Sequence, residues 1–167
     1  SEVKAAERFN CSRNTLRESF TRLAAERIVE RIPNRGVFLA MPDADYIRDL
    51  FAARAAIEPA AVRWGAFPDA PSLVTLTSSA FDYAARGEHQ EVSAINQRFH
   101  RTLVAALGSP TLNEQMANLL ARMRLTFLLA IPRYPQLHAD HIQGNITLAT
   151  LIADGKRDEA ATLAHDS

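Results

Sequence analysis

The sequence holds a single cysteine and no apolar run long enough to cross a membrane. Cys11 has no partner for an internal disulfide, and a membrane helix would need roughly 18 or more consecutive apolar residues. The sequence also has no signal-peptide pattern. These absences predict a cytoplasmic protein with no membrane partner. We expect Cys11, in the turn before Ser12, to pack in the core, because free cysteines are often buried.

The common signatures of enzymes are missing as well. There is no glycine-rich phosphate loop, no Gly-x-Ser-x-Gly elbow and no His-Glu-x-x-His pair. The sequence therefore predicts a protein that is not an enzyme. One alternative stays open, a helical-bundle metal-dependent enzyme that uses the histidines.

Net charge is also missing, because 19 Lys and Arg balance 19 Asp and Glu. The distribution is uneven: residues 1–41 carry eight basic and five acidic side chains, and the rest carries 11 basic and 14 acidic ones. A basic segment before an acidic body is typical of a nucleic-acid-binding module joined to a regulatory one. The length of 167 residues allows one large or two small domains, and 47% hydrophobic residues suffice for a sizeable core.

Residues 12–40 predict a helix followed by a β-hairpin. Ser12 is a good N-cap, because its hydroxyl can accept a hydrogen bond from a free backbone N–H of the first turn. Two β-prone runs, residues 28–31 and 36–40, flank the turn sequence Pro33-Asn34-Arg35-Gly36. Apolar residues recur at the i, i+4, i+7 spacing of one helical face, namely Leu16, Phe20 and Leu23.

The polar residues of this segment suit double-stranded DNA. In the major groove Arg pairs with guanine and Asn with adenine, and a basic hairpin tip can reach phosphates or the minor groove. A solvated amphipathic helix packed on a hairpin is the alternative that the residues alone leave open. The candidate DNA contacts are Arg13, Asn14, Thr15 and Arg17 on the helix, and Asn34, Arg35 and Gly36 at the tip.

Several short motifs occur together in residues 2–40: an Ala-Glu-Arg helix, a turn into Ser-Arg, a Leu-Arg-Glu step, an Arg-Leu-Ala-Ala-Glu run and Pro-Asn-Arg-Gly. In this order they resemble the winged helix-turn-helix of the GntR family of bacterial transcription regulators. The resemblance implies a DNA-binding domain over residues 1–41. It also implies that this domain is incomplete at its N-terminus, because the family has a further helix there.

Beyond a linker at residues 41–45 the pattern is helical almost throughout. We predict a mainly α fold, in which an all-helical effector-binding bundle of about six helices follows the winged helix-turn-helix. Pro59 should kink or break the first bundle helix. The expected helices span residues 45–65, 71–87, 91–107, 111–129 and 137–154, with a last one from about residue 158.

This second part resembles the FCD ligand-binding domain of FadR-type members of the GntR family. The matching stretches are residues 49–61, Asn-Gln-Arg-Phe-His at 96–100 with Gly-Ser-Pro-Thr-Leu at 108–112, and residues 145–161. The resemblance implies that residues 45–167 bind a small organic-acid effector and dimerise. It further implies a homodimeric regulator, a repressor, on a pseudo-palindromic operator.

The resemblance also implies a metal position, because the family's cavity often holds a divalent metal on an Asp, a His four residues later, and two further histidines. The matching positions here are Asn96, His100 and Asn145, and the fourth falls at or beyond Ser167. A zinc-, nickel- or manganese-type ion would sit at His100 with Asn96 as a weak partner. A degraded site that no longer needs metal is equally open. His141, one turn before Asn145, could substitute, whereas His138 is expected at the surface.

Arg54 precedes Glu58 by one helical turn. Its guanidinium can clamp a carboxylate ligand or pair with Glu58, and both alternatives stay open. One of Arg122 and Arg124 should point into the cavity, and the other should stay solvated. The aromatic residues Trp64, Phe81 and Tyr83 should serve packing. The candidate effector-binding residues are Arg54, Asn96, His100, His141 and Asn145.

Overall fold

A computed structural model of the chain describes residues 2–130 and 137–167. It divides into two compact units, Ser1–Asp43 and Ala44–Ser167. None of the described helices is long and apolar enough to span a membrane.

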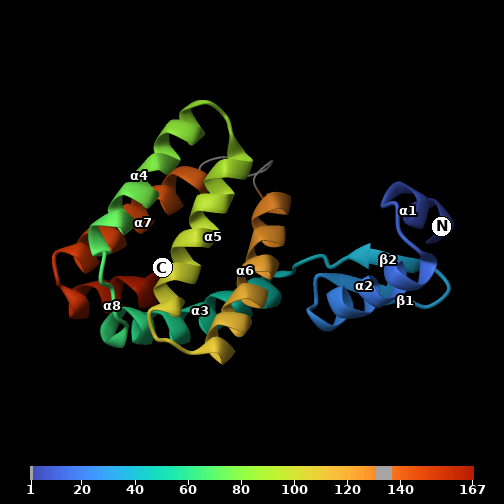
Figure 1. Cartoon of the computed structure of the whole chain (residues 1–167), viewed down its shortest axis with the longest axis horizontal. Coiled ribbons are helices and arrows are strands. Elements are labelled where there is room, and N and C mark those ends of the chain that lie inside the picture. Colours follow the sequence, from blue (N-terminus) through green and yellow to red (C-terminus); the bar gives the residue numbers. More distant parts are fainter. Residues whose placement is uncertain (1, 131–136) are drawn as a thin grey trace. The chain divides into compact units, whose positions relative to one another are not determined.

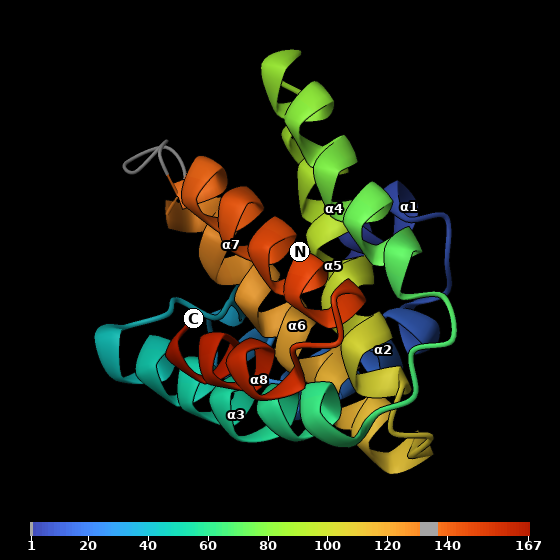
Figure 2. The same ribbon diagram turned by 90° about the vertical axis from the view of Figure 1, so that its left-hand side faces the viewer.

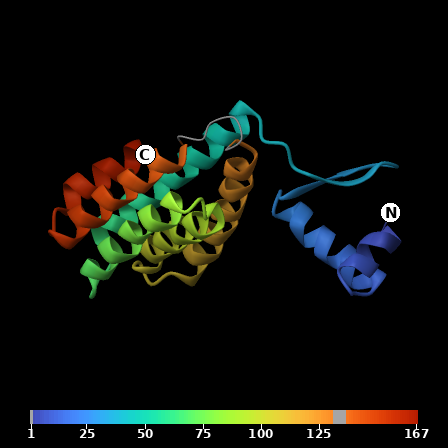
Figure 3. The same ribbon diagram turned by 90° about the horizontal axis from the view of Figure 1, so that it is seen from above.

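The first unit contains two helices and one hairpin. Helix α1 spans Glu2–Arg8 and α2 spans Arg13–Ala25, and strands β1 (Val29–Ile32) and β2 (Gly36–Leu39) follow. The strands are antiparallel, with Val29 opposite Leu39 and Ile32 opposite Gly36. Figure 3 shows α2 beside this hairpin, and α2 packs on β1. The predicted helix and hairpin are therefore confirmed.

Local chemistry explains this arrangement. The Ser12 hydroxyl accepts a hydrogen bond from the backbone N–H of Thr15 at 3.0 Å, as expected of an N-cap. The hairpin turn places Asn34 and Gly36 at φ values of 60° and 118°, a region that favours Asn and Gly. Cys11, predicted as a core residue, is only partly buried. The small core of the unit consists of Ala6, Leu16, Val29 and Ala40.

The second unit is a bundle of helices, as predicted. Helix α4 packs on α7 and α5, and α5 packs on α6 (Figure 1). Helices α3 and α8 lie side by side (Figure 2). The helices span Ala44–Trp64 (α3), Ala70–Ala85 (α4), His89–Ala105 (α5), Pro110–Ala130 (α6), Leu137–Ala153 (α7) and Arg157–Asp166 (α8).

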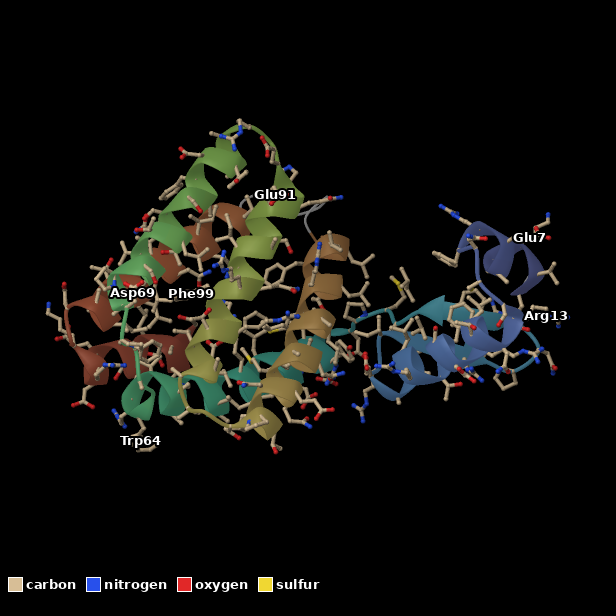
Figure 4. All side chains as sticks on the ribbon, in the orientation of Figure 1. Glu7, Arg13, Trp64, Asp69, Glu91 and Phe99 are labelled. Carbon is tan, nitrogen blue, oxygen red and sulfur yellow. The ribbon has the colours of Figure 1, made fainter. Side chains whose placement is uncertain are left out.

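Two expectations about the C-terminal half of α3 fail in part. Pro59 lies inside this helix, which continues to Trp64, so the predicted break does not occur. Its neighbours Glu58 and Ala61 are buried, and this packing offsets the roughly 3 kcal/mol that an interior proline costs. Trp64, predicted to pack, is 72% exposed, because it lies at the helix end and at the edge of the bundle (Figure 4).

The other aromatic residues for which packing was predicted lie on α4. Tyr83 packs on the cluster of Ala80, Val92 and Ile142, as expected. Phe81 is largely exposed, so the packing prediction is wrong for this residue. The two side chains lie on different faces of the helix, because positions two residues apart do not share a face.

Helix α5 lies at the centre of the bundle and contributes to each of its apolar clusters. Phe99 and Leu103 are fully buried against α3, α4, α7 and α8 (Figure 4). Val104 belongs to a second cluster with residues of α3 and α6, and Val92 to a third with residues of α4 and α7. Polar residues of α5 are therefore held by a helix that is packed on several sides.

Candidate ligand pocket and nucleic-acid surface

A pocket lies among helices α3 to α7 of the bundle. It encloses about 730 Å³ between the atoms, including the space at its open mouth. Its apolar walls include Val92, Leu120, Met123 and Ile142. No carboxylate is present among the described residues that line it. The polar lining includes Arg54, Asn96, Gln97, Arg124, His141 and Asn145.

Two lining residues join α5 to α7. The Asn145 amide nitrogen Nδ2 donates a hydrogen bond to Asn96 Oδ1 at 2.7 Å, in a partly buried position. Both residues were predicted for the site, and the structure brings them into direct contact. The contact links two helices through neutral amides.

A buried polar cluster lies next to this lining. Glu58 Oε1 is 2.6 Å from His100 Nδ1, and Glu58 Oε2 is 3.7 Å from Arg54 Nε. All three residues are at most 3% exposed, so the charge of the carboxylate is compensated by Arg54 and His100 inside the bundle rather than by solvent. The Arg54 guanidinium also lies 5.0 Å from the Phe51 ring centroid. Arg54 thus pairs with Glu58, as one of the two alternatives predicted, and it also lines the pocket, where a clamp on a ligand carboxylate stays a prediction.

His100 lies apart from the other predicted residues. Arg54, Asn96, His141 and Asn145 line the pocket, whereas His100 is not part of the lining and contacts Glu58 instead. His141 packs edge-on against Phe127, with ring centroids 4.7 Å apart. The roles of all five residues in effector binding stay predictions.

Of the two arginines of α6, one lines the pocket as predicted, whereas the other, predicted to stay solvated, has a side chain that is only 12% exposed. Arg124 lines the pocket, whereas Arg122 donates from Nε to Tyr46 Oη at 3.0 Å. Sequence reasoning missed His89 and Ser93, which line the pocket together with the predicted Asn96 as a polar stripe of α5. Their spacing of i, i+4 and i+7 is that of one helical face and would have revealed the stripe.

The donor set for a metal ion is poor. Within residues 2–130 and 137–167, no group of three or more His, Cys, Asp and Glu side chains could hold one. The predicted metal position contributes the His100 imidazole, whose Nδ1 contacts Glu58, and the neutral Asn96 amide. His138 lies outside the described side chains.

The predicted DNA-contact residues of the first unit are all exposed. Asn14 Nδ2 donates to Glu18 Oε1 at 3.0 Å, and Arg17 Nε donates to Glu2 Oε2 at 2.9 Å. The hydrogen bond from Arg17 lowers the pKa of the Glu2 carboxyl below its ordinary value. Two of the candidate side chains therefore have acidic partners within the unit, and the positive charge of Arg13 also contributes to lowering the pKa of Glu2.

At the hairpin turn, Asn34, Arg35 and Gly36 are exposed as well. The Arg35 guanidinium lies 5.7 Å from the Phe38 ring centroid, which places a cation beside an aromatic ring at the hairpin tip. Figure 4 shows the side chains of this unit, with Arg13 labelled on α2. The exposed set has the composition that contacts to bases and phosphates require.

Comparison with known proteins gives these two units a family. Residues 1–39 match the model of bacterial regulatory proteins of the gntR family, and residues 49–166 match the FCD domain. The Nta operon transcriptional regulator of Aminobacter aminovorans is 27% identical over 169 residues, covering 98% of this chain and 79% of that protein. A crystal structure of a GntR transcriptional regulator from Rhodococcus sp. RHA1 is 27% identical, with a TM-score of 0.83, covering 98% of this chain and 79% of that one.

A second curated relative is the galactonate operon transcriptional repressor of Escherichia coli (strain K12). It is 27% identical over 148 residues, which cover 75% of this chain and 64% of that protein. The chain therefore spans less than two thirds of this relative. The family matches confirm the predicted fold class and set aside the alternative of a metal-dependent enzyme. The chain belongs to the GntR family of bacterial transcription regulators, with an FCD domain after its DNA-binding segment.

Proposed function

We propose that this regulator is a homodimeric repressor whose residues 1–41 bind operator DNA and whose residues 45–167 bind a small organic acid. The observation that carries the effector class is the charge of the pocket lining. Arg54 and Arg124 face it with guanidinium groups, and no described lining residue is a carboxylate. Such a lining favours an anion, because guanidinium pairs with carboxylate through two parallel hydrogen bonds.

The DNA-binding part of the proposal relies on the exposed face of α2. Arg13, Asn14, Thr15 and Arg17 occupy its first two turns, where a recognition helix contacts base edges. Asn34, Arg35 and Gly36 at the hairpin tip suit the adjacent backbone or minor groove. Dimers of such modules read two half-sites, which supports a pseudo-palindromic operator. The name of the galactonate operon repressor supports repression over activation.

The organic acid would occupy the pocket between the arginines and the amides of Asn96 and Asn145. Hydroxyl and carboxylate oxygens suit this mixture of cationic and amide groups. His141 lies on the same lining, and His100 acts through Glu58 behind it. An effector changes DNA binding only if it prefers one arrangement of the protein over the other.

The test begins with selection of an operator from a randomised DNA pool, followed by mobility shifts. We expect Arg13→Ala to weaken binding by about 1–3 kcal/mol and to relax base preference at one position of each half-site. Arg22→Ala is the matched control, because this exposed arginine lies in the last turn of the same helix. Equal losses in both variants would contradict the recognition-helix assignment.

The same assay then tests the effector. Carboxylates and sugar acids are added to the complex, and we expect at least one to release the DNA. Arg124→Gln should abolish this release, whereas Arg98→Gln should retain it, because Arg98 is exposed and does not line the pocket. Release that survives Arg124→Gln would remove the pocket assignment.

A further inference from the structure

The residues at the family's metal position contact each other in this chain. Asn96 on α5 and Asn145 on α7 share a hydrogen bond of 2.7 Å, and both line the pocket. We infer that the pocket works without a metal ion, and that this amide pair forms the polar contact between α5 and α7 at the position where a metal would lie. The inference takes from the proposed function only that this pocket is the effector site.

The donor atoms present do not fit a divalent ion. Zinc-, nickel- and manganese-type ions select imidazole and carboxylate ligands, and an amide oxygen is a neutral, weaker donor. Asn96 Oδ1 already accepts the hydrogen bond of Asn145 Nδ2. For both residues to bind one ion, Asn145 would have to turn its oxygen inward, and this bond would be lost.

The surrounding charge opposes a cation further. The closest acidic group in the buried cluster is Glu58, which contacts His100 Nδ1 at 2.6 Å and Arg54 Nε at 3.7 Å. A carboxylate on Nδ1 is the usual partner of a metal-binding histidine, but here Arg54 compensates the same carboxylate. A divalent ion would therefore add positive charge beside a carboxylate that Arg54 already compensates, in a lining that has Arg124 as a further cation.

The amide pair keeps atoms for a ligand. Beyond the shared bond, Asn96 retains its Nδ2 donor and Asn145 its Oδ1 acceptor. One donor and one acceptor suit a hydroxyl or carboxyl group, whereas the arginines suit the negative charge. The pocket thus binds an organic anion directly and does not require a metal to hold it.

The experiment measures metal directly. The protein is stripped with a chelator, incubated with Zn²⁺, Ni²⁺ or Mn²⁺ in turn, desalted and subjected to elemental analysis. We expect no stoichiometric metal in the wild type and no shift of its thermal midpoint on chelation. The double variant Asn96→Asp with Asn145→His supplies a carboxylate one helical turn before His100 and an imidazole at the contact between α5 and α7. It should bind one ion per chain and lose it on addition of His100→Gln.

Two results would overturn the inference. One is stoichiometric metal in the wild type that Asn96→Ala or His100→Gln removes. The other is a double variant that stays free of metal, because the two amides would then not be what excludes it. The metal measurements are made without DNA, so they do not depend on operator binding. If the wild type proves free of metal and no organic acid releases the operator, the proposed function fails while this inference stands.

Discussion

Replacing the charged Glu58 by the neutral glutamine of nearly the same shape should destabilise the bundle, because the loss of charge matters more than the change in shape. The side chain is 1% exposed and lies between His100 and Arg54, at 2.6 and 3.7 Å. Glu58→Gln preserves the shape and an oxygen that can accept from His100 Nδ1. It leaves the Arg54 charge buried without its counter-ion, which costs about 3–5 kcal/mol.

A second variant separates charge from packing. Adding Arg54→Met to Glu58→Gln removes the orphaned cation, and replacing a buried ion pair by neutral groups of similar volume is often close to neutral. We therefore expect the double variant to recover most of the loss and to lie within about 1–2 kcal/mol of the wild type.

Urea unfolding followed by circular dichroism measures both changes in the free energy of unfolding. The protein concentration is held constant, because the stability of the proposed dimer would depend on it. The reasoning is refuted if Glu58→Gln costs less than about 1 kcal/mol, or if the double variant is as unstable as the single one.

The remaining predictions concern the first unit. Glu2→Gln should raise operator affinity, because it releases Arg17 and removes a negative charge. Mobility shifts compare this variant with Glu7→Gln, which removes a negative charge from the same helix. Equal gains in affinity would exclude a role for the Arg17–Glu2 ion pair. Because the folded pKa of Glu2 is lowered, the pair stabilises the unit above the ordinary pKa of Glu and is lost as pH falls through the lowered value. Leu16→Ala, at 4% exposure, should cost the first unit about 2–5 kcal/mol by thermal unfolding. An unchanged transition would show that Leu16 is not its core.

The helices could be predicted because their signals are local. Ser12 caps α2, and the apolar spacing that follows places Leu16 inside the first unit. Pro59 is an exception to the local rule that proline ends a helix, because α3 continues through it. Its flanking residues Glu58, Ala61 and Val62 are buried by α5 and its neighbours, and no short stretch of sequence contains that packing.

The pocket was predicted only in part, for a related reason. Asn96 and His100 are four residues apart and were expected to act together. In the structure Asn96 lines the pocket, whereas His100 contacts Glu58, a residue 42 positions earlier. Helical spacing places two side chains near one face but does not say which distant partner either one meets. Arg124 and the Asn96–Asn145 bond likewise depend on how separate helices pack.

Two roles were predicted for Arg54, an ion pair with Glu58 and a contact with a ligand carboxylate, and the geometry of the pair is compatible with both. Its Nε lies 3.7 Å from Glu58 Oε2, which is longer than a hydrogen bond, so the pair is an ionic contact that does not fix the whole guanidinium fork. A ligand carboxylate can approach the same fork from the pocket only if it does not take Arg54 away from Glu58, because that would leave the buried carboxylate with His100 alone. The proposed organic acid would therefore add its negative charge to the cluster and need a second cation. Arg124 of α6 lines the pocket and is the candidate for that cation, whereas Arg54 and Glu58 belong to α3 and His100 to α5. The charge balance of the pocket thus requires contributions from three helices at once.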